Sequence, residues 1–310
     1  MNFLGLVQRL TQEAGASGAG PTDVVGQQGE YARMVNWVND AWLDIQSLHQ
    51  DWEFLRTTCS FPTVDGQAVY TATQANATNF GMWDIDTFRN YANPSVTLSI
   101  ASPCVANIQG HGLSVGDTVT FFTTGALPTG MTAGTVYYVA SVVDADNFTF
   151  ATTATGTAIN TSGSQSGTQT MTSGNTLDFS GLRSEIFMEE DHYANWRDLY
   201  MYGNLRFTRT RPMDIAVSPA KSLCLGPIPQ DGYTIVGDYF QAPTYMVAKT
   251  DTPSLPIQYQ MAIVWKALTF YGGYEEDAAT VMRGENMFNE FKNRMELNFL
   301  PNVDFTGALA

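Results

Sequence analysis

The middle of the chain has a composition unlike the rest, and this difference constrains the fold more than any other feature. From Ser95 to Thr172 there is no Lys, Arg, Glu or Trp, while Thr, Ser, Gly and Val dominate. Runs at 118–123, 136–143 and 147–151 are rich in β-forming residues and are separated by Gly or Asp turns. A low-complexity linker would share the Thr and Ser content, but the regularly placed Val, Phe and Tyr favour a fold. We therefore predict a small all-β domain over residues 95–172, inserted into a second domain.

The segments on either side of the insert are dominated by helical patterns. Apolar residues recur at steps of three and four over 29–52, and residues 257–274 are apolar on nearly every face. Helices are predicted over residues 3–14, 29–52, 191–203, 257–274 and 275–299. Short β-rich runs with Gly and Pro turns are predicted to form strands over residues 54–72 and 213–241.

These elements define the expected domain organisation. Residues 1–94 and 173–296 would form one discontinuous domain, and residues 297–310 an extended C-terminal tail. The predicted fold class is α+β: mainly a helical bundle with a small antiparallel β element, plus the inserted all-β domain.

The charge balance limits the partners of the chain. Lys and Arg number 15 against 30 Asp and Glu, a net charge of −15, which argues against tight binding of phosphate backbones because such binding relies on basic side chains. A wall that repels passing DNA remains compatible with this charge. The sequence has no apolar stretch long enough to cross a membrane and no signal peptide pattern, so we expect no membrane anchor and folding in a reducing cytoplasm. In that compartment the three cysteines, Cys59, Cys104 and Cys224, are expected to be buried free thiols.

No motif for catalysis or cofactor binding is present. The chain lacks a nucleophile elbow, a phosphate-binding loop and a dinucleotide fingerprint. The three histidines, His49, His111 and His192, are far apart in sequence, so no metal site is predicted. We therefore expect no catalytic, cofactor-binding or metal-binding residues, and a protein that is not an enzyme.

One acidic cluster leaves a second interpretation open. Glu189, Glu190 and Asp191 precede His192, and paired carboxylates can act as acid and base in glycan cleavage. Acidic residues are also favoured at the start of a helix, and the residues that follow have helical spacing. The capping interpretation is the preferred one.

Three segments of the predicted discontinuous domain together resemble the adaptor, or head-to-tail connector, proteins of tailed phages. They are residues 3–52, 205–246 and 251–278, which begin FLGLVQRLTQEAG, LRFTRTRPMDIAV and DTPSLPIQYQMAI. The insert, with GHGLSVGDTVTFF over 110–122, resembles a β-module found in many phage virion proteins.

The resemblance implies a structural virion protein of the tail or neck, assembled in the host bacterial cytoplasm. Twelve copies would form a ring that docks on the portal protein and extends the DNA exit channel toward a downstream nozzle or tube protein, without sequence-specific DNA binding and with a role in DNA ejection. The insert is where this sequence departs from that family, and its position between Tyr91 and Leu177 suggests a projection able to contact a tail fibre, another tail protein or a host surface glycan. Two alternatives stay open: another ring or nozzle component of the tail, and a virion-associated protein that binds or hydrolyses glycans.

The C-terminal tail carries the candidate contact residues for the portal or a neighbouring subunit. An extended tail can bury its apolar side chains on a neighbour when it becomes ordered. The candidates are Phe299, Leu300, Val303 and Phe305.

Overall fold

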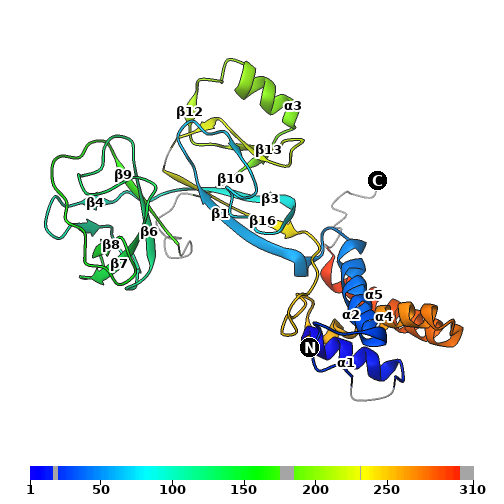
Figure 1. Ribbon diagram of the computed structural model, residues 1–310. Coiled ribbons are helices and arrows are strands. Elements are labelled where there is room, and N and C mark those ends of the chain that lie inside the picture. Colours follow the sequence, from blue (N-terminus) through cyan, green and yellow to red (C-terminus); the bar gives the residue numbers. More distant parts are fainter. Residues whose placement is uncertain (17–19, 175–184, 231, 301–310) are drawn as a thin grey trace. The chain divides into compact units, whose positions relative to one another are not determined.

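The computed structural model describes residues 1–16, 20–174, 185–230 and 232–300, and the chain divides into two compact units (Figure 1). Unit 1 contains residues 1–57, the short stretch Asn79–Trp83 and the chain from Tyr239 onward. Unit 2 contains Thr58–Thr78 and Asp84–Asp238. The boundary between the units falls within three strands, β1 (Arg56–Pro62), β3 (Phe80–Ala92) and β16 (Tyr233–Gln241).

Unit 1 is built on helices from both ends of the chain. The helices are α1 (Phe3–Glu13), α2 (Gly29–Leu48), α4 (Met261–Tyr274) and α5 (Ala278–Phe299), with the 3-10 turns η1 (Glu53–Leu55) and η3 (Ile257–Tyr259). Helix α4 packs against α1, α2 and α5, which explains why its sequence is apolar on nearly every face. The core contains Leu6, Leu10, Val38, Trp42, Ile263 and Leu268.

The helices in unit 1 are shorter than the ranges predicted from sequence: α1 ends one residue earlier, at Glu13, and α4 begins at Met261 rather than at residue 257, after the turn η3. Helix α2 ends at Leu48 rather than at residue 52, because His49 adopts an extended backbone and Trp52 folds back, its Nε1 donating to the Ile45 carbonyl at 2.9 Å. Helix α5 begins at Ala278 rather than at residue 275. Glu276 has a φ of 56°, which interrupts the helical backbone, and the side chain of Asp277 then accepts from the Ala279 N–H at 3.0 Å as the N-cap.

Three sheets lie wholly or mostly in unit 2, outside the charge-poor middle of the chain. One has the order β1-β16-β3-β10, formed by Arg56–Pro62, Tyr233–Gln241, Phe80–Ala92 and Glu185–Phe187. A smaller one has the order β11-β13-β14-β2, formed by Glu189–Glu190, Asp214–Val217, Leu223–Gly226 and Val69–Tyr70. The third pairs β12 (Arg209–Thr210) with β15 (Ile228–Pro229).

The charge-poor middle of the chain forms a six-stranded antiparallel sheet with its own core. Its order is β4-β5-β8-β7-β6-β9, formed by Thr97–Leu98, Val105–Asn107, Asn147–Ala151, Val136–Val142, Thr118–Thr123 and Gln169–Ser173. Phe121, Phe148 and Phe150 are fully buried in this core. The two ends of the segment are adjacent, because the Met171 N–H donates to the Pro94 carbonyl at 3.1 Å.

The expected fold class, a mainly helical bundle with a small β element, is wrong. Among the described residues, strands occupy about as much of the chain as helices do, so the fold is mixed. The largest omission is β3, thirteen residues over Phe80–Ala92. Its sequence does not alternate cleanly, because the polar side chain of Asn90 is fully buried among the apolar ones, where its Nδ2 donates to the Pro212 carbonyl at 2.7 Å.

Candidate functional site

A helix segment covers the small β11-β13-β14-β2 sheet, and part of it is wound as a π-helix. Helix α3 (Tyr193–Trp196) continues into the π-helix η2 (Arg197–Tyr202), so the helix predicted over 191–203 starts two residues later than expected and changes its winding. Single turns of π-helix are often found at functional positions.

The side chains that hold this helix on the sheet are Trp196 and Tyr200. Both are buried in a small core with Ala68, Ala216 and Cys224. The Tyr200 hydroxyl donates a hydrogen bond to Asp214, and burial, followed by that hydrogen bond, raises the pKa of Tyr200 above its usual value. Gly226 makes room for the ring, since a Cβ there would lie 2.3 Å from Tyr200 Cε2. The inner face of the segment is therefore fixed closely against the sheet.

The end of this helix and the residues that follow it expose large side chains. From Met201 to Thr210 every residue except Gly203 is exposed, including Tyr202 at 72% and Phe207 at 79%. The Arg206 guanidinium lies 4.6 Å from the centre of the Phe207 ring. A concentration of exposed apolar and aromatic side chains on a well-anchored element is typical of a surface that meets another macromolecule.

The acidic cluster forms an edge strand and a cap. Glu189 and Glu190 are exposed in β11, at the edge of the sheet, and pair in parallel with Asp214 and Ile215 of β13. The N-cap of α3 is His192, whose Nδ1 accepts from the Ala194 N–H at 3.4 Å. The acids precede the helix, as the preferred interpretation required, but the capping contact comes from the histidine.

The other two histidines have structural contacts. His111 is buried beside Phe148, and its ring bonds to the Asp144 carbonyl at 3.1 Å and to the Leu113 N–H at 3.0 Å. His49 Nε2 lies 3.1 Å from Glu296 Oε1. Among the described residues, no three His, Cys, Asp or Glu side chains gather in a way that could hold a metal ion.

The cysteines are buried free thiols, as predicted. Burial is the main cause that raises the pKa of Cys59 to about 12 and that of Cys224 to about 11, and burial also raises the pKa of Cys104. These thiols are poor nucleophiles because the thiolate is the reactive form.

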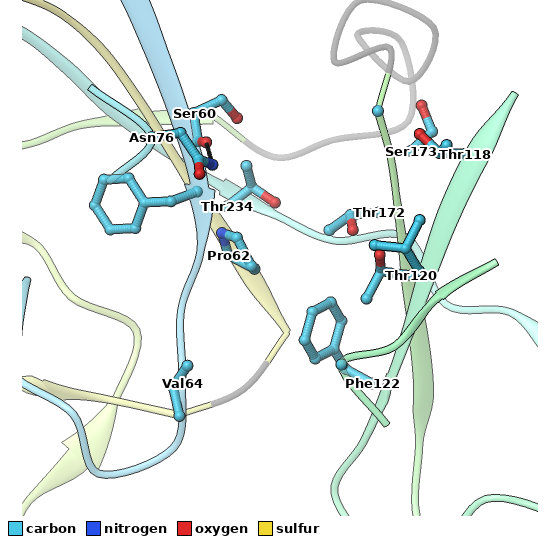
Figure 2. Close-up of a pocket in the computed structure, with 14 residues that line it drawn as sticks. Ser60, Pro62, Val64, Asn76, Thr118, Thr120, Phe122, Thr172, Ser173 and Thr234 are labelled. Carbon is cyan, nitrogen blue, oxygen red and sulfur yellow. Dashed lines mark hydrogen bonds between the residues drawn. The ribbon is translucent and has the colours of Figure 1, made fainter. Parts of the chain in front are cut away.

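A pocket of about 430 Å³ lies in unit 2 (Figure 2). Thr120 and Thr172, which face each other across β6 and β9, line it, together with Ser60 and Thr234 and the ring of Phe122. None of the described residues that line it is ionisable, so the pocket offers no acid–base pair.

The candidate contact residues of the C-terminal tail are only partly within the described chain. Phe299 ends α5 and packs edge-on against Tyr259 and Phe54, with ring centres 5.2 and 5.7 Å apart. Leu300 is also packed against the helical core of unit 1. Val303 and Phe305 lie outside the described residues.

Together these features define a class of protein: one of mixed α and β structure whose candidate site is an exposed surface of apolar and aromatic side chains. A comparison with protein families gives the affiliation. The family described as SU10 adaptor protein matches residues 141–303, a little over half of the chain, and the chain belongs to that family. It is therefore a phage adaptor protein, a structural component of a virion, which confirms the resemblance seen in the sequence at the level of the family. No curated protein matches the chain. In the described part of the chain no helix is long and apolar enough to cross a membrane.

Proposed function

We propose that this chain is a head-to-tail adaptor, twelve copies of which form a ring that docks on the portal and extends the DNA exit channel toward the tail. The family match carries this proposal, since it covers a little over half of the chain and names an adaptor. The large exposed side chains around Tyr202 and Phe207 support it, because a subunit of an assembly needs surfaces that are buried only against its neighbours.

The charge of the chain suits a passage for DNA. Twelve copies at −15 each would carry −180. Carboxylates facing the channel would repel the phosphate backbone, so DNA would slide past without being held. A ring whose bore is lined by Lys and Arg would contradict this part of the proposal.

The remaining partners follow from the same role. A nozzle or tube protein would bind the tail-facing side of the ring, and the six-stranded sheet would contact a tail fibre. The C-terminal residues that include Phe299 and Leu300 would bind the portal or a neighbouring copy. The ring would assemble in the host cytoplasm and remain in the tail or neck of the virion.

The proposed role includes no enzymatic step. Glu189 and Glu190 are consecutive exposed residues of the edge strand β11, and successive side chains of a strand point to opposite faces, so the two carboxylates do not face each other across a glycan-binding cleft. A zymogram of the full-length protein against bacterial cell wall is expected to show no lytic band. A band lost in the Glu189→Gln or Glu190→Gln variant would replace the structural role with a hydrolytic one.

Electron microscopy of the purified protein mixed with its portal tests the central proposal. A twelve-fold ring at the tail-facing end of the portal is the expected result. If the protein instead bound only downstream of an existing adaptor, it would be a different tail component.

A further inference from the structure

We infer that neighbouring copies in the ring meet through two surfaces beside the small β11-β13-β14-β2 sheet. One is formed by the end of its helix and the turn that follows, and the other by the strand β11 and residues next to it. One surface, here called the arginine face, contains Leu199, Met201, Tyr202, Leu205, Arg206 and Phe207. The other, here called the acidic edge, contains Phe187, Glu189, Glu190 and Met213. The inference rests on the proposed ring and names the contact that would close it.

The arginine face has the composition of the centre of a protein interface. Its apolar members are all more than one-third exposed, and Tyr202 and Phe207 are the most exposed. Among the described residues no carboxylate pairs with Arg206, which instead stacks on Phe207. Tyr, Phe, Met and Arg are the residue types enriched at interface cores, and Tyr and Arg are frequent hot spots.

The acidic edge offers the complementary chemistry. Glu189 and Glu190 are exposed, and no cation among the described residues pairs with either of them. Phe187 is 60% exposed and Met213 is 52% exposed, so apolar surface borders the two carboxylates. Met213 is adjacent to the strand itself, because its carbonyl accepts from the Glu189 N–H at 2.9 Å. Arg89 stacks on Phe187, but its charge is paired with Glu185 at 2.8 Å.

The two surfaces consist of different residues at different places around the sheet. The acidic edge is on β11, the first strand in the order β11-β13-β14-β2. The segment that carries the arginine face ends at Arg209, which forms an ion pair with Asp65 at 2.8 Å, in the turn that leads into β2, the last strand. Two different surfaces that bind each other on successive copies make a heterologous contact, and such contacts close into rings when the rotation between copies permits it.

A second copy fits this surface better than DNA does. Residues 197–211 hold four Arg against one Asp, a net charge of +3, whereas the whole chain carries −15, which leaves −18 on the rest. The rest of another copy therefore carries the charge opposite to that of this segment. Leu199, Met201 and Leu205 would be left in water or against phosphate in a DNA complex, whose interfaces are more polar than those between proteins.

A charge-swap experiment on the full-length chain tests the contact. The variant Arg206→Glu is expected to weaken association between copies at least about tenfold, with loss of rings on the portal in electron micrographs. The triple variant Arg206→Glu with Glu189→Arg and Glu190→Arg is expected to restore the rings. The control Arg294→Glu makes the same change of charge at an exposed position of α5 and is expected to assemble like the wild type.

Cysteine cross-linking gives an independent readout. Copies with Arg206→Cys mixed with copies with Glu190→Cys are expected to form a disulfide-linked dimer on the portal, while neither variant alone does so. The three native cysteines are buried and do not compete.

The outcomes separate this inference from the proposed function. If the wild type forms rings and Arg206→Glu forms them equally well, or if the cysteine pair does not link, the contact is wrong and the adaptor role stands. If the wild type forms no ring on its portal, the adaptor role itself fails, and the contact with it. If Arg206→Glu abolishes binding of a labelled DNA duplex but leaves the rings intact, the arginine face binds DNA and the inference is overturned.

Discussion

At the scale of single residues, a hydrogen bond between a histidine and a carboxylate links the end of one helix to another. His49 follows the last residue of α2, and its ring lies 3.1 Å from the Glu296 carboxylate of α5. The hydrogen bond with His49 is the main cause that lowers the pKa of Glu296 from its usual 4.5, and Lys292 adds a favourable charge.

This pair predicts an acid-dependent loss of stability. Because the folded-state pKa of Glu296 is below its unfolded value, the stabilisation is complete above about pH 4.5 and disappears as the pH falls through the folded pKa. The variant Glu296→Gln is expected to lose less stability than the wild type between pH 6 and pH 3, as measured by urea unfolding at each pH. If the free energy of unfolding fell by the same amount in both proteins between pH 6 and pH 3, the pair would not contribute to stability.

A second residue-scale prediction concerns the tyrosine under the candidate site. Tyr200→Phe keeps the ring beside Gly226 but removes the hydroxyl that donates to Asp214. We expect a loss of about 1 kcal/mol in the free energy of unfolding, measured by denaturant titration. The matched control Tyr202→Phe changes an exposed hydroxyl and is expected to have no measurable effect. A loss of the same size in both variants would contradict the role assigned to the buried hydroxyl.

At the scale of elements, glycine sets the close packing of α4 and α5. A Cβ on Gly284 would lie 2.9 Å from Thr269 Cγ2 and 3.0 Å from the Trp265 carbonyl oxygen. The two helices therefore approach closely at this point, and the α5 residue there has no room for a side chain.

The packing of these helices predicts opposite effects for two glycines. Gly284→Ala is expected to destabilise the protein by about 1–3 kcal/mol because the added methyl group overfills the contact. Gly273→Ala, near the end of α4, meets nothing within 4 Å and is expected to be neutral or stabilising by up to about 1 kcal/mol. Thermal unfolding of both variants measures the difference, and a destabilised Gly273→Ala or a neutral Gly284→Ala would contradict it.

Some elements of this chain can be predicted directly from its sequence, and others cannot. Helix α4 was predictable because an apolar stretch of that length must be surrounded by protein, and the strands β6, β7 and β8 because Val, Phe and Tyr are concentrated between turn residues. Strand β3 was missed because a buried asparagine obscures its pattern. The π-helix was also missed, because its sequence differs in no obvious way from that of an α-helix.

At the scale of the whole molecule, the six-stranded sheet begins and ends at one place. Met171 and Pro94 are joined by a backbone hydrogen bond of 3.1 Å, and the sheet has its own core. Replacing Ser95–Thr172 with a short Gly-Ser linker is therefore expected to leave the rest of the fold intact and to preserve the ring on the portal. Circular dichroism and electron microscopy of the variant with its portal measure both. Loss of the ring with retention of helical signal would show that this sheet takes part in assembly.

The candidate site could be predicted from the sequence only in part. The acidic cluster was recognised by its composition, but its position on an edge strand depends on pairing with β13, more than twenty residues further along the chain. The exposure of Tyr202 and Phe207 was not predicted, since large apolar side chains are more often buried than exposed. A signal was present in the cluster of arginines among them, in a chain that is otherwise strongly acidic.

The helical unit has a consequence for the order in which the protein folds. Helices α1 and α2 are made first, but α4, against which both pack, is made only after residues 58–238. At a synthesis rate of about 5–20 residues per second, the N-terminal helices wait on the order of ten seconds or more for their partner, while the strands of unit 2 can already pair. A chain that ends before α4 therefore lacks the helix against which both α1 and α2 pack. Only a finished polypeptide can complete the helical unit, so prematurely terminated chains are excluded from any assembly that requires it.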